Sequence, residues 1–197
     1  NFAISNPGGF SFICLIPTHI HHAQVFILPH NKYPPRRKTS FIQNHKSIME
    51  QDTFDLAQIS LRPLLLSDAD DFMVWATDER VARFCIWEPY TSKDAAVDFI
   101  QNNASKCSLF RAICVGDRAI GSISVQSYTG NDRARAKSAE LGYVLGFKYW
   151  GKGIATKAVK MVVEMAFADF PYLERLEALV DVENVASQRV LEKAGFQ

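Results

Sequence analysis

The residues from Tyr149 to Thr156 have the types and spacing of a phosphate-binding loop. They lie between a strand-like segment at 139–146 and a helix-like one at 155–168, and they read Tyr149-Trp150-Gly151-Lys152-Gly153-Ile154-Ala155-Thr156. Glycines at the start of a helix let the backbone approach a ligand, and the free N–H groups and positive dipole end of the helix then attract an anion. The same strand, turn and helix also occur as a plain connection in many α/β proteins, so the loop alone leaves both interpretations open.

Asn184 and Ser187 are three positions apart at the start of the last predicted helix, and this spacing places both on one helix face. All five histidines precede Met49, at positions 19, 21, 22, 30 and 45. The chain from Met49 onward therefore cannot hold a Ser-His-Asp or Cys-His centre. A general base in that part has to be a carboxylate, a tyrosine, a lysine or a bound water.

The charge of the chain is unevenly distributed. Its net charge is +1, but residues 1–48 contain five basic and no acidic residues, which leaves 17 basic and 21 acidic residues after them. A mildly acidic body argues against nucleic-acid binding and is compatible with a cationic, amine-bearing substrate. No apolar run approaches the roughly 18 residues that span a membrane. The four cysteines lack metal-ligand spacing, and His19, His21 and His22 lack a second ligand pair, so no metal site is expected.

The first 48 residues are predicted to be an extension. They show no sustained helix or strand period and contain five prolines. We expect residues 1–48 to be disordered or accessory, and residues 49–197, from Met49 onward, to form the folded domain. The lack of acidic residues would suit an organelle transit peptide, but arginine is scarce and no basic amphipathic helix is visible. The cysteines read as small buried thiols of a reducing compartment, which indicates a cytoplasmic protein.

After Met49, apolar periods and turn signals predict the order β-α-α-β-β-β-α-β-α. Strands are expected at 59–63, 109–115, 119–125, 139–145 and 175–182, with a hairpin turn at 116–117. Helices are expected from the capping residues Ser67 and Thr91, at 155–168, and from Asn184 to Gly195. This order predicts an α/β (α+β) fold with a mixed sheet, whose βαβ unit holds the glycine loop.

Three motifs in this order resemble the GCN5-related N-acetyltransferase (GNAT) superfamily and, within it, the ribosomal-protein-alanine acetyltransferase-like (RimJ/RimL-like) branch. They are Ala139-Glu140-Leu141-Gly142-Tyr143, the glycine loop, and Val182-Glu183-Asn184-Val185-Ala186-Ser187 with Leu191-Glu192-Lys193-Ala194-Gly195-Phe196. The resemblance covers residues 59–197 and none of 1–48. It implies the acyl-CoA N-acyltransferase fold, a mostly antiparallel twisted sheet flanked by helices. It also implies transfer of an acetyl group from acetyl-CoA to a primary amine by direct attack in a ternary complex.

The resemblance assigns an acetyl-CoA site to positions of this chain. Backbone N–H groups of residues 151–156 would bind the diphosphate, and Lys148 and Lys152 would neutralise it, unless both are ordinary surface charges. Trp150 stands where the family pattern has arginine or glutamine, so no charged contact is expected from it. The strand at 143–145 would pair with the pantetheine arm through its backbone. The expected cofactor-binding residues are Tyr143, Val144, Leu145, Lys148, Trp150, Gly151, Lys152, Gly153, Ile154, Ala155, Thr156, Asn184 and Ser187.

Glu140 and Ser187 are the expected catalytic residues. By the resemblance, Glu140 would accept the amine proton, directly or through water, Asn184 would hold the pantetheine, and Ser187 would protonate the departing sulfur. The tyrosine that often serves as the acid in the superfamily corresponds to Leu191 here. The alternative interpretations are an exposed strand carboxylate at Glu140 and a plain N-cap with a first-turn serine at the other two positions.

The acceptor is left open: a protein N-terminus, a polyamine or another small amine would fit, for a monomer or a homodimer. The alternative functions are a catalytically impaired acetyl-CoA-binding or regulatory domain and a phosphate-binding NTPase, although the GxxxxGK[ST] pattern is absent. The family continues past Gly195-Phe196 with a further strand pair, whereas this sequence ends at Gln197. Without those C-terminal strands, the strand at 175–182 is expected to expose an edge, which lowers stability and activity.

Overall fold

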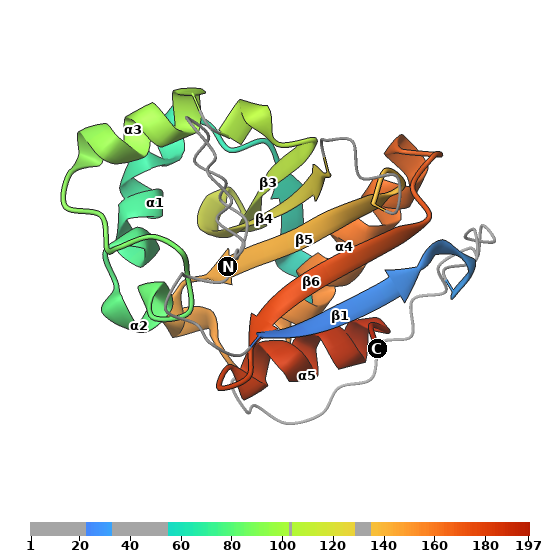
Figure 1. Ribbon diagram of the computed structural model, residues 1–197. Helices are drawn as coiled ribbons and strands as arrows, with labels where there is room; N and C mark the ends of the chain where they lie inside the picture. Colours follow the sequence, from blue (N-terminus) through green and yellow to red (C-terminus); the bar gives the residue numbers. More distant parts are fainter. Residues whose placement is uncertain (1–22, 33–54, 103, 129–134) are drawn as a thin grey trace, which may run out of the picture.

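The computed structural model describes residues 23–32, 55–102, 104–128 and 135–197, and a six-stranded sheet forms its centre (Figure 1). The strand order is β1-β6-β5-β4-β3-β2. Neighbouring strands are antiparallel except β5 and β6, which run parallel. The predicted mixed, mostly antiparallel sheet is confirmed. The strands are β1 Ala23–Pro29, β2 Ile59–Arg62, β3 Leu109–Val115, β4 Arg118–Ser127, β5 Ser138–Leu145 and β6 Arg175–Asp181.

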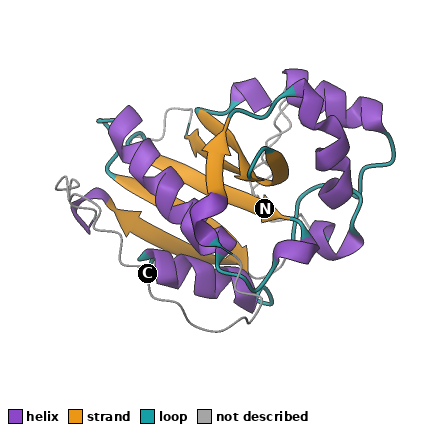
Figure 2. Ribbon diagram, turned by 180° about the vertical axis from the view of Figure 1, so that it is seen from behind, coloured by secondary structure: helices purple, strands orange, loops and turns teal. Residues whose placement is uncertain are grey.

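Helices cover both faces of the sheet. On one face lie α4 (Ile154–Asp169) and α5 (Val185–Ala194), which Figure 2 shows from behind. On the other face α1 (Ala69–Ala76), the short α2 (Glu79–Ala82) and α3 (Lys93–Asn102) pack against Phe110 and Val144. One-turn 3-10 helices lie at His30–Lys32, Leu56–Gln58, Leu66–Asp68, Ala104–Lys106 and Phe147–Tyr149. Buried residues of α4 recur every three or four positions, which is the period of a helix with one face in the core. They include Ala158, Val159, Val162, Val163 and Ala166.

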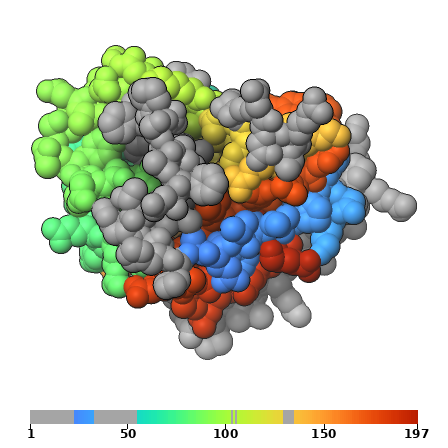
Figure 3. Space-filling view, in the orientation of Figure 1, coloured from blue at the N-terminus to red at the C-terminus, as the bar shows by residue number. Residues whose placement is uncertain are grey.

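β1 corrects the expectation that residues 1–48 lie outside the fold. It pairs antiparallel with the full length of β6, and Figure 3 shows the two side by side at the surface. Phe26 and Leu28 are buried in the core beneath α4 and α5, and the backbone of Ile27 exchanges two hydrogen bonds with Gln197, at 2.8 and 3.0 Å. The predicted exposed edge of the strand at 175–182 is therefore wrong, because β1 covers it. The rest of residues 1–48, apart from the turn at 30–32, lies outside the described residues.

α1 begins at a different residue from the one that the capping pattern in the sequence predicts. Residues 66–68 form a 3-10 turn and α1 begins only at Ala69, so Ser67 does not cap it. The Asp68 carboxylate instead accepts the Leu65 N–H at 2.8 Å and binds the Arg62 guanidinium at 2.7 and 2.8 Å. This charged acceptor ties the 3-10 turn to the end of β2, and no side chain of the described residues caps α1. Residues 129–134, between β4 and β5, lie outside the described residues.

Candidate active site

β5 and β6 lie side by side only at their start. Their pairing runs from Ser138 opposite Arg175 to Glu140 opposite Glu177 and then stops. Beyond Glu140 the two strands diverge toward their carboxyl ends, as Figure 1 shows. The strand register places the vertex of this opening at Glu140.

The opening exposes backbone groups of β5. The Gly146 N–H donates to the Ile120 carbonyl of β4 at 2.9 Å, so the backbone of Gly146 faces β4. Because backbone direction alternates along a strand, Leu145 and Tyr143 turn their N–H and C=O groups away from β4, into the opening. The same alternation turns the backbone of Val144 toward β4. Of the predicted strand residues, Val144 can therefore contribute only its side chain to the site.

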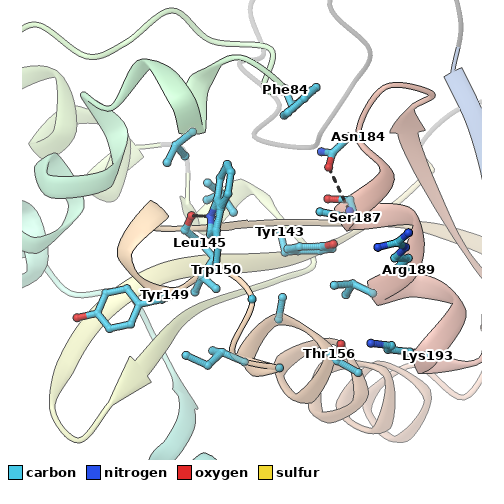
Figure 4. Close-up of a pocket in the computed structure, with 18 of the residues that line it drawn as sticks. Phe84, Tyr143, Leu145, Tyr149, Trp150, Thr156, Asn184, Ser187, Arg189 and Lys193 are labelled. Atoms are coloured by element: carbon cyan, nitrogen blue, oxygen red, sulfur yellow. Dashed lines mark hydrogen bonds between the residues drawn. The ribbon is translucent and has the colours of Figure 1, made fainter. Parts of the chain in front are cut away.

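A cavity of about 300 Å³ lies in this opening (Figure 4). Its walls come from the end of α2, from β5, from the glycine loop with the first turn of α4, and from α5. Most of the predicted cofactor-binding residues meet there, although they come from three separate sequence motifs. Those in the wall are Tyr143, Val144, Leu145, Trp150, Gly151, Gly153, Ile154, Ala155, Thr156, Asn184 and Ser187.

The glycine loop presents the N-terminus of α4 to the cavity. Gly151 and Gly153 have φ angles of 74° and 77°, in the left-handed region that favours glycine. Gly153 is the N-cap of α4, and no side chain caps the helix there. The N–H groups of Ile154, Ala155 and Thr156 consequently have no partner within the helix and lie at its positive end. This geometry fits a phosphate group.

Trp150 fixes the loop to the end of β5. Its indole Nε1 donates to the Leu145 carbonyl at 2.6 Å, and its ring forms part of the cavity wall. A neutral hydrogen bond to the protein's own backbone agrees with the expectation that Trp150 makes no charged contact with a ligand. This bond occupies the Leu145 carbonyl. A ligand in the opening can therefore most easily reach the N–H and C=O of Tyr143 and the N–H of Leu145.

The cations of the site differ from those predicted. Lys148 and Lys152 do not line the cavity. Lys148 lies on the turn at 147–149 and lines a separate hollow, and Lys152 is exposed. Arg189 and Lys193 line the cavity instead, and Figure 4 shows both pointing into it from α5. Their i, i+4 spacing marks one helix face in the sequence, but only the fold shows that this face meets the glycine loop.

Asn184 and Ser187 meet at the start of α5. The Asn184 Oδ1 accepts the Ser187 N–H at 3.1 Å, the dashed contact in Figure 4, and both residues line the cavity. Asn184 is thus confirmed as the N-cap of α5, while the roles of both residues toward pantetheine and the sulfur stay predictions. Leu191 is fully buried in the core and lies outside the cavity wall. Phe84 and Cys85, which close the cavity from the end of α2, belong to no motif and were not among the expected cofactor-binding residues.

Glu140 lies at the vertex of the opening rather than in the cavity wall. It is 2% exposed, so the alternative of an exposed strand carboxylate is wrong. The Tyr128 hydroxyl donates to its Oε2 at 3.3 Å, whereas its buried Oε1 has no hydrogen-bond partner among the described residues. Burial is the largest influence and raises the pKa of Glu140 to about 7; Tyr128 and Arg135 lower the pKa, and Glu177 raises it. A carboxylate that gains and loses a proton near neutral pH is suited to general base catalysis.

Two properties of the described residues bear on metal binding and on membranes. In that part of the chain, no three His, Cys, Asp or Glu side chains gather in a way that could hold a metal ion. Nor does any helix there have the length and apolar character needed to cross a membrane.

The model of the acetyltransferase (GNAT) domain family matches residues 58–197. The chain belongs to this family. It is 30% identical over 154 residues to the uncharacterized N-acetyltransferase p20 of Bacillus licheniformis, a match that covers 74% of this chain and 83% of the relative. Membership of the GNAT family, together with this relative, supports transfer of an acetyl group to an amine as the general activity.

Two solved structures show the GNAT fold. The aminoglycoside acetyltransferase AAC(6')-Ib in complex with coenzyme A has a TM-score of 0.59 at 19% identity, over 71% of this chain and 84% of that one. The ribosomal-protein-S5-alanine acetyltransferase from Vibrio fischeri has a TM-score of 0.55 at 22% identity, over 75% of this chain and 84% of that one. The predicted GNAT-like fold class is confirmed.

Proposed function

We propose that this protein transfers the acetyl group of acetyl-CoA to a primary amine by direct attack in a ternary complex. The observation that carries the proposal is one cavity that combines three features: open strand backbone, a helix N-terminus without a side-chain cap, and two cations. Acetyl-CoA contains matching parts, namely amides in its arm and a chain of phosphates. The neighbouring structure of AAC(6')-Ib with coenzyme A supports the same ligand for this chain.

Each feature binds a different part of the ligand in this proposal. The backbone of Tyr143 and the N–H of Leu145 pair with the pantetheine amides as an added strand would. The N–H groups of residues 151–156 hold the diphosphate at the positive end of α4. Arg189 and Lys193 neutralise phosphate charge from α5, in the place that the sequence assigned to Lys148 and Lys152.

The chemistry requires a neutral amine, a polarised thioester and a protonated leaving group. The amine nitrogen attacks the thioester carbon, so an N–C bond forms as the C–S bond breaks. Because Glu140 lies behind the cavity wall, we propose that its free Oε1 takes the amine proton through a bound water. Ser187 delivers a proton to the departing sulfur and regains one from solvent. The products are an N-acetylated amine and coenzyme A.

Binding and catalysis can be tested separately. In titration calorimetry, acetyl-CoA should bind and ATP should bind more weakly, because ATP has no arm to pair with β5. Mass spectrometry should then detect an acetylated product in a panel of an alanine-terminated peptide, a polyamine and an aminoglycoside. Preference for ATP would favour the NTPase alternative. Acetyl-CoA binding with no product from any amine would favour the catalytically impaired domain.

The finer assignments are also proposals. The alanine-terminated peptide in the panel tests the RimJ/RimL-like branch, which the three motifs support. The aminoglycoside tests a small-molecule acceptor, which the structures of AAC(6')-Ib with ribostamycin and coenzyme A support by analogy. A cytoplasmic location and a monomeric or dimeric state stay predictions.

A further inference from the structure

We propose that Tyr128 and Glu177 are positioning residues that control when Glu140 carries a proton, with the Tyr128 hydroxyl as the shared bridge. This inference rests on the proposed function, in which Glu140 accepts the proton of the amine. It adds two residues that belong to none of the three sequence motifs.

The Tyr128 hydroxyl lies within hydrogen-bond distance of both carboxylates. Glu140 and Glu177 are opposite each other at the last paired position of β5 and β6, and they are 2% and 3% exposed. The Tyr128 hydroxyl, just past the end of β4, lies 3.3 Å from Glu140 Oε2 and 3.2 Å from Glu177 Oε2. A hydroxyl has one proton to donate, so it can stabilise only one of the two carboxylates at a time.

The two carboxylates have unequal surroundings. Glu177 Oε1 accepts from Arg175 Nε at 2.8 Å, and its Oε2 lies 3.8 Å from a guanidinium nitrogen of Arg135. Arg135 also stacks over the Tyr128 ring, 4.6 Å from the ring centroid. Among the described residues, Glu140 accepts a hydrogen bond from Tyr128 alone, and its Oε1 has no partner there. Both arginines thus contact Glu177, whereas burial raises the pKa of Glu140.

Both neighbours act on Glu140, but in opposite directions. From the described elements around it, the titratable and charged groups that face it are Tyr128, Arg135, Glu177 and, through Glu177, Arg175. The Tyr128 hydroxyl donates to the ionised carboxylate and so favours the loss of its proton. The negative charge of Glu177 opposes that loss. Burial raises the pKa of Glu140 to about 7, and the two neighbours adjust it in opposite directions around the pH at which a general base works best.

Two variants of nearly unchanged size separate these influences. Tyr128→Phe removes the donated hydrogen bond, so the acidic limb of the pH profile of kcat/KM should move to higher pH. Glu177→Gln removes the like charge, so the limb should move to lower pH. We expect each displacement to be about one pH unit, the scale of a single hydrogen bond or neighbouring charge. Residues with a merely structural role would lower activity without moving the limb in opposite directions.

Tyr172→Phe is the matched control. It removes a hydroxyl that contacts Ser127 Oγ at 3.1 Å, next to Tyr128 in the chain, from a side chain that is 51% exposed. The pH profile of this variant should coincide with that of the natural chain. Displacement of both test variants in the same direction, no displacement of either, or an equal displacement in the control would overturn the proposal.

A second measurement does not depend on activity. In protein labelled with ¹³C at the glutamate carboxyl, the Glu140 resonance is identified by its loss in Glu140→Gln, and its titration is followed by NMR. Its midpoint should rise in Tyr128→Phe and fall in Glu177→Gln. If the natural chain acetylates no amine, the proposed function fails while this titration still decides the inference. If the chain is active and the midpoint does not move, the inference fails and the function stands.

Discussion

Replacement of Glu140 by glutamine should stabilise the fold at high pH while it abolishes acetyl transfer. The folded pKa of about 7 lies above the ordinary value of 4.5, so between these pH values the folded state binds more protons than the unfolded chain. The stability contributed by this group is therefore fully present below pH 4.5 and is lost as the pH rises through 7. Glutamine imitates the protonated acid, since its carbonyl can still accept the hydrogen bond from Tyr128.

The size of the effect follows from the two pKa values. Far above pH 7, ionisation of Glu140 costs the folded state about 3 kcal/mol relative to the protonated form. Between pH 5 and pH 8 the cost changes by about 2.5 kcal/mol. This is less than the full value, because Glu140 of the unfolded chain is already partly ionised at pH 5 and Glu140 of the folded state is still partly protonated at pH 8. In Glu140→Gln this cost is absent, whereas all other titrating groups act equally on both proteins. The difference in unfolding free energy between the variant and the natural chain should therefore increase in favour of the variant by about 2.5 kcal/mol from pH 5 to pH 8.

Urea unfolding at pH 5, 6, 7 and 8 measures this difference directly. Glu192→Gln is the control, because Glu192 is an exposed carboxylate on α5. The free energy of its unfolding should follow that of the natural chain at every pH. A difference between Glu140→Gln and the natural chain that is independent of pH, or that shrinks as the pH rises, would refute the buried, easily protonated carboxylate at the vertex.

Three further predictions concern the cavity and the sheet. Arg189→Ala should raise the Kd for acetyl-CoA about tenfold in calorimetry by removing one charge-assisted contact, and Lys148→Ala should change it little; equal effects would contradict the cation assignment. Trp150→Phe should lower the free energy of unfolding by about 1 kcal/mol through the lost hydrogen bond to the end of β5, and an unchanged urea midpoint would count against that bond. Phe26→Ala should cost about 3 kcal/mol because its ring is in the core, whereas the exposed Val25→Ala should cost far less; similar small costs would place β1 outside the fold.

The parts of the site that depend on local sequence could be predicted. The positive φ angles of Gly151 and Gly153, the N-cap at Asn184 and the stop at Gly195 each follow from a few neighbouring residues. The order of strands and longer helices after Met49 was also accessible, because apolar periods are local patterns, whereas the four-residue α2 was not predicted. These features were enough to bring the three motifs to one cavity through the family resemblance.

The parts that depend on distant partners could not be predicted. β1 is a short apolar run that ends at Pro29 in a proline-rich stretch, and only pairing with β6, some 150 residues later, makes it a strand. The face of α5 with Arg189 becomes a cavity wall only through its packing beside α4. Glu140 reads as a strand carboxylate in the sequence, and its burial against Tyr128 and Glu177 results from the register of three strands.

The most direct test of acetyl transfer is a single-turnover reaction of this protein with acetyl-CoA and the amine panel. Acetylated amine, detected by mass spectrometry, and free thiol should form in equal amounts with the natural chain. Glu140→Gln should bind acetyl-CoA with unchanged affinity and form neither product at a comparable rate. Release of thiol without acetylated amine, or full activity of Glu140→Gln, would contradict amine acetylation through a base at the vertex of β5 and β6.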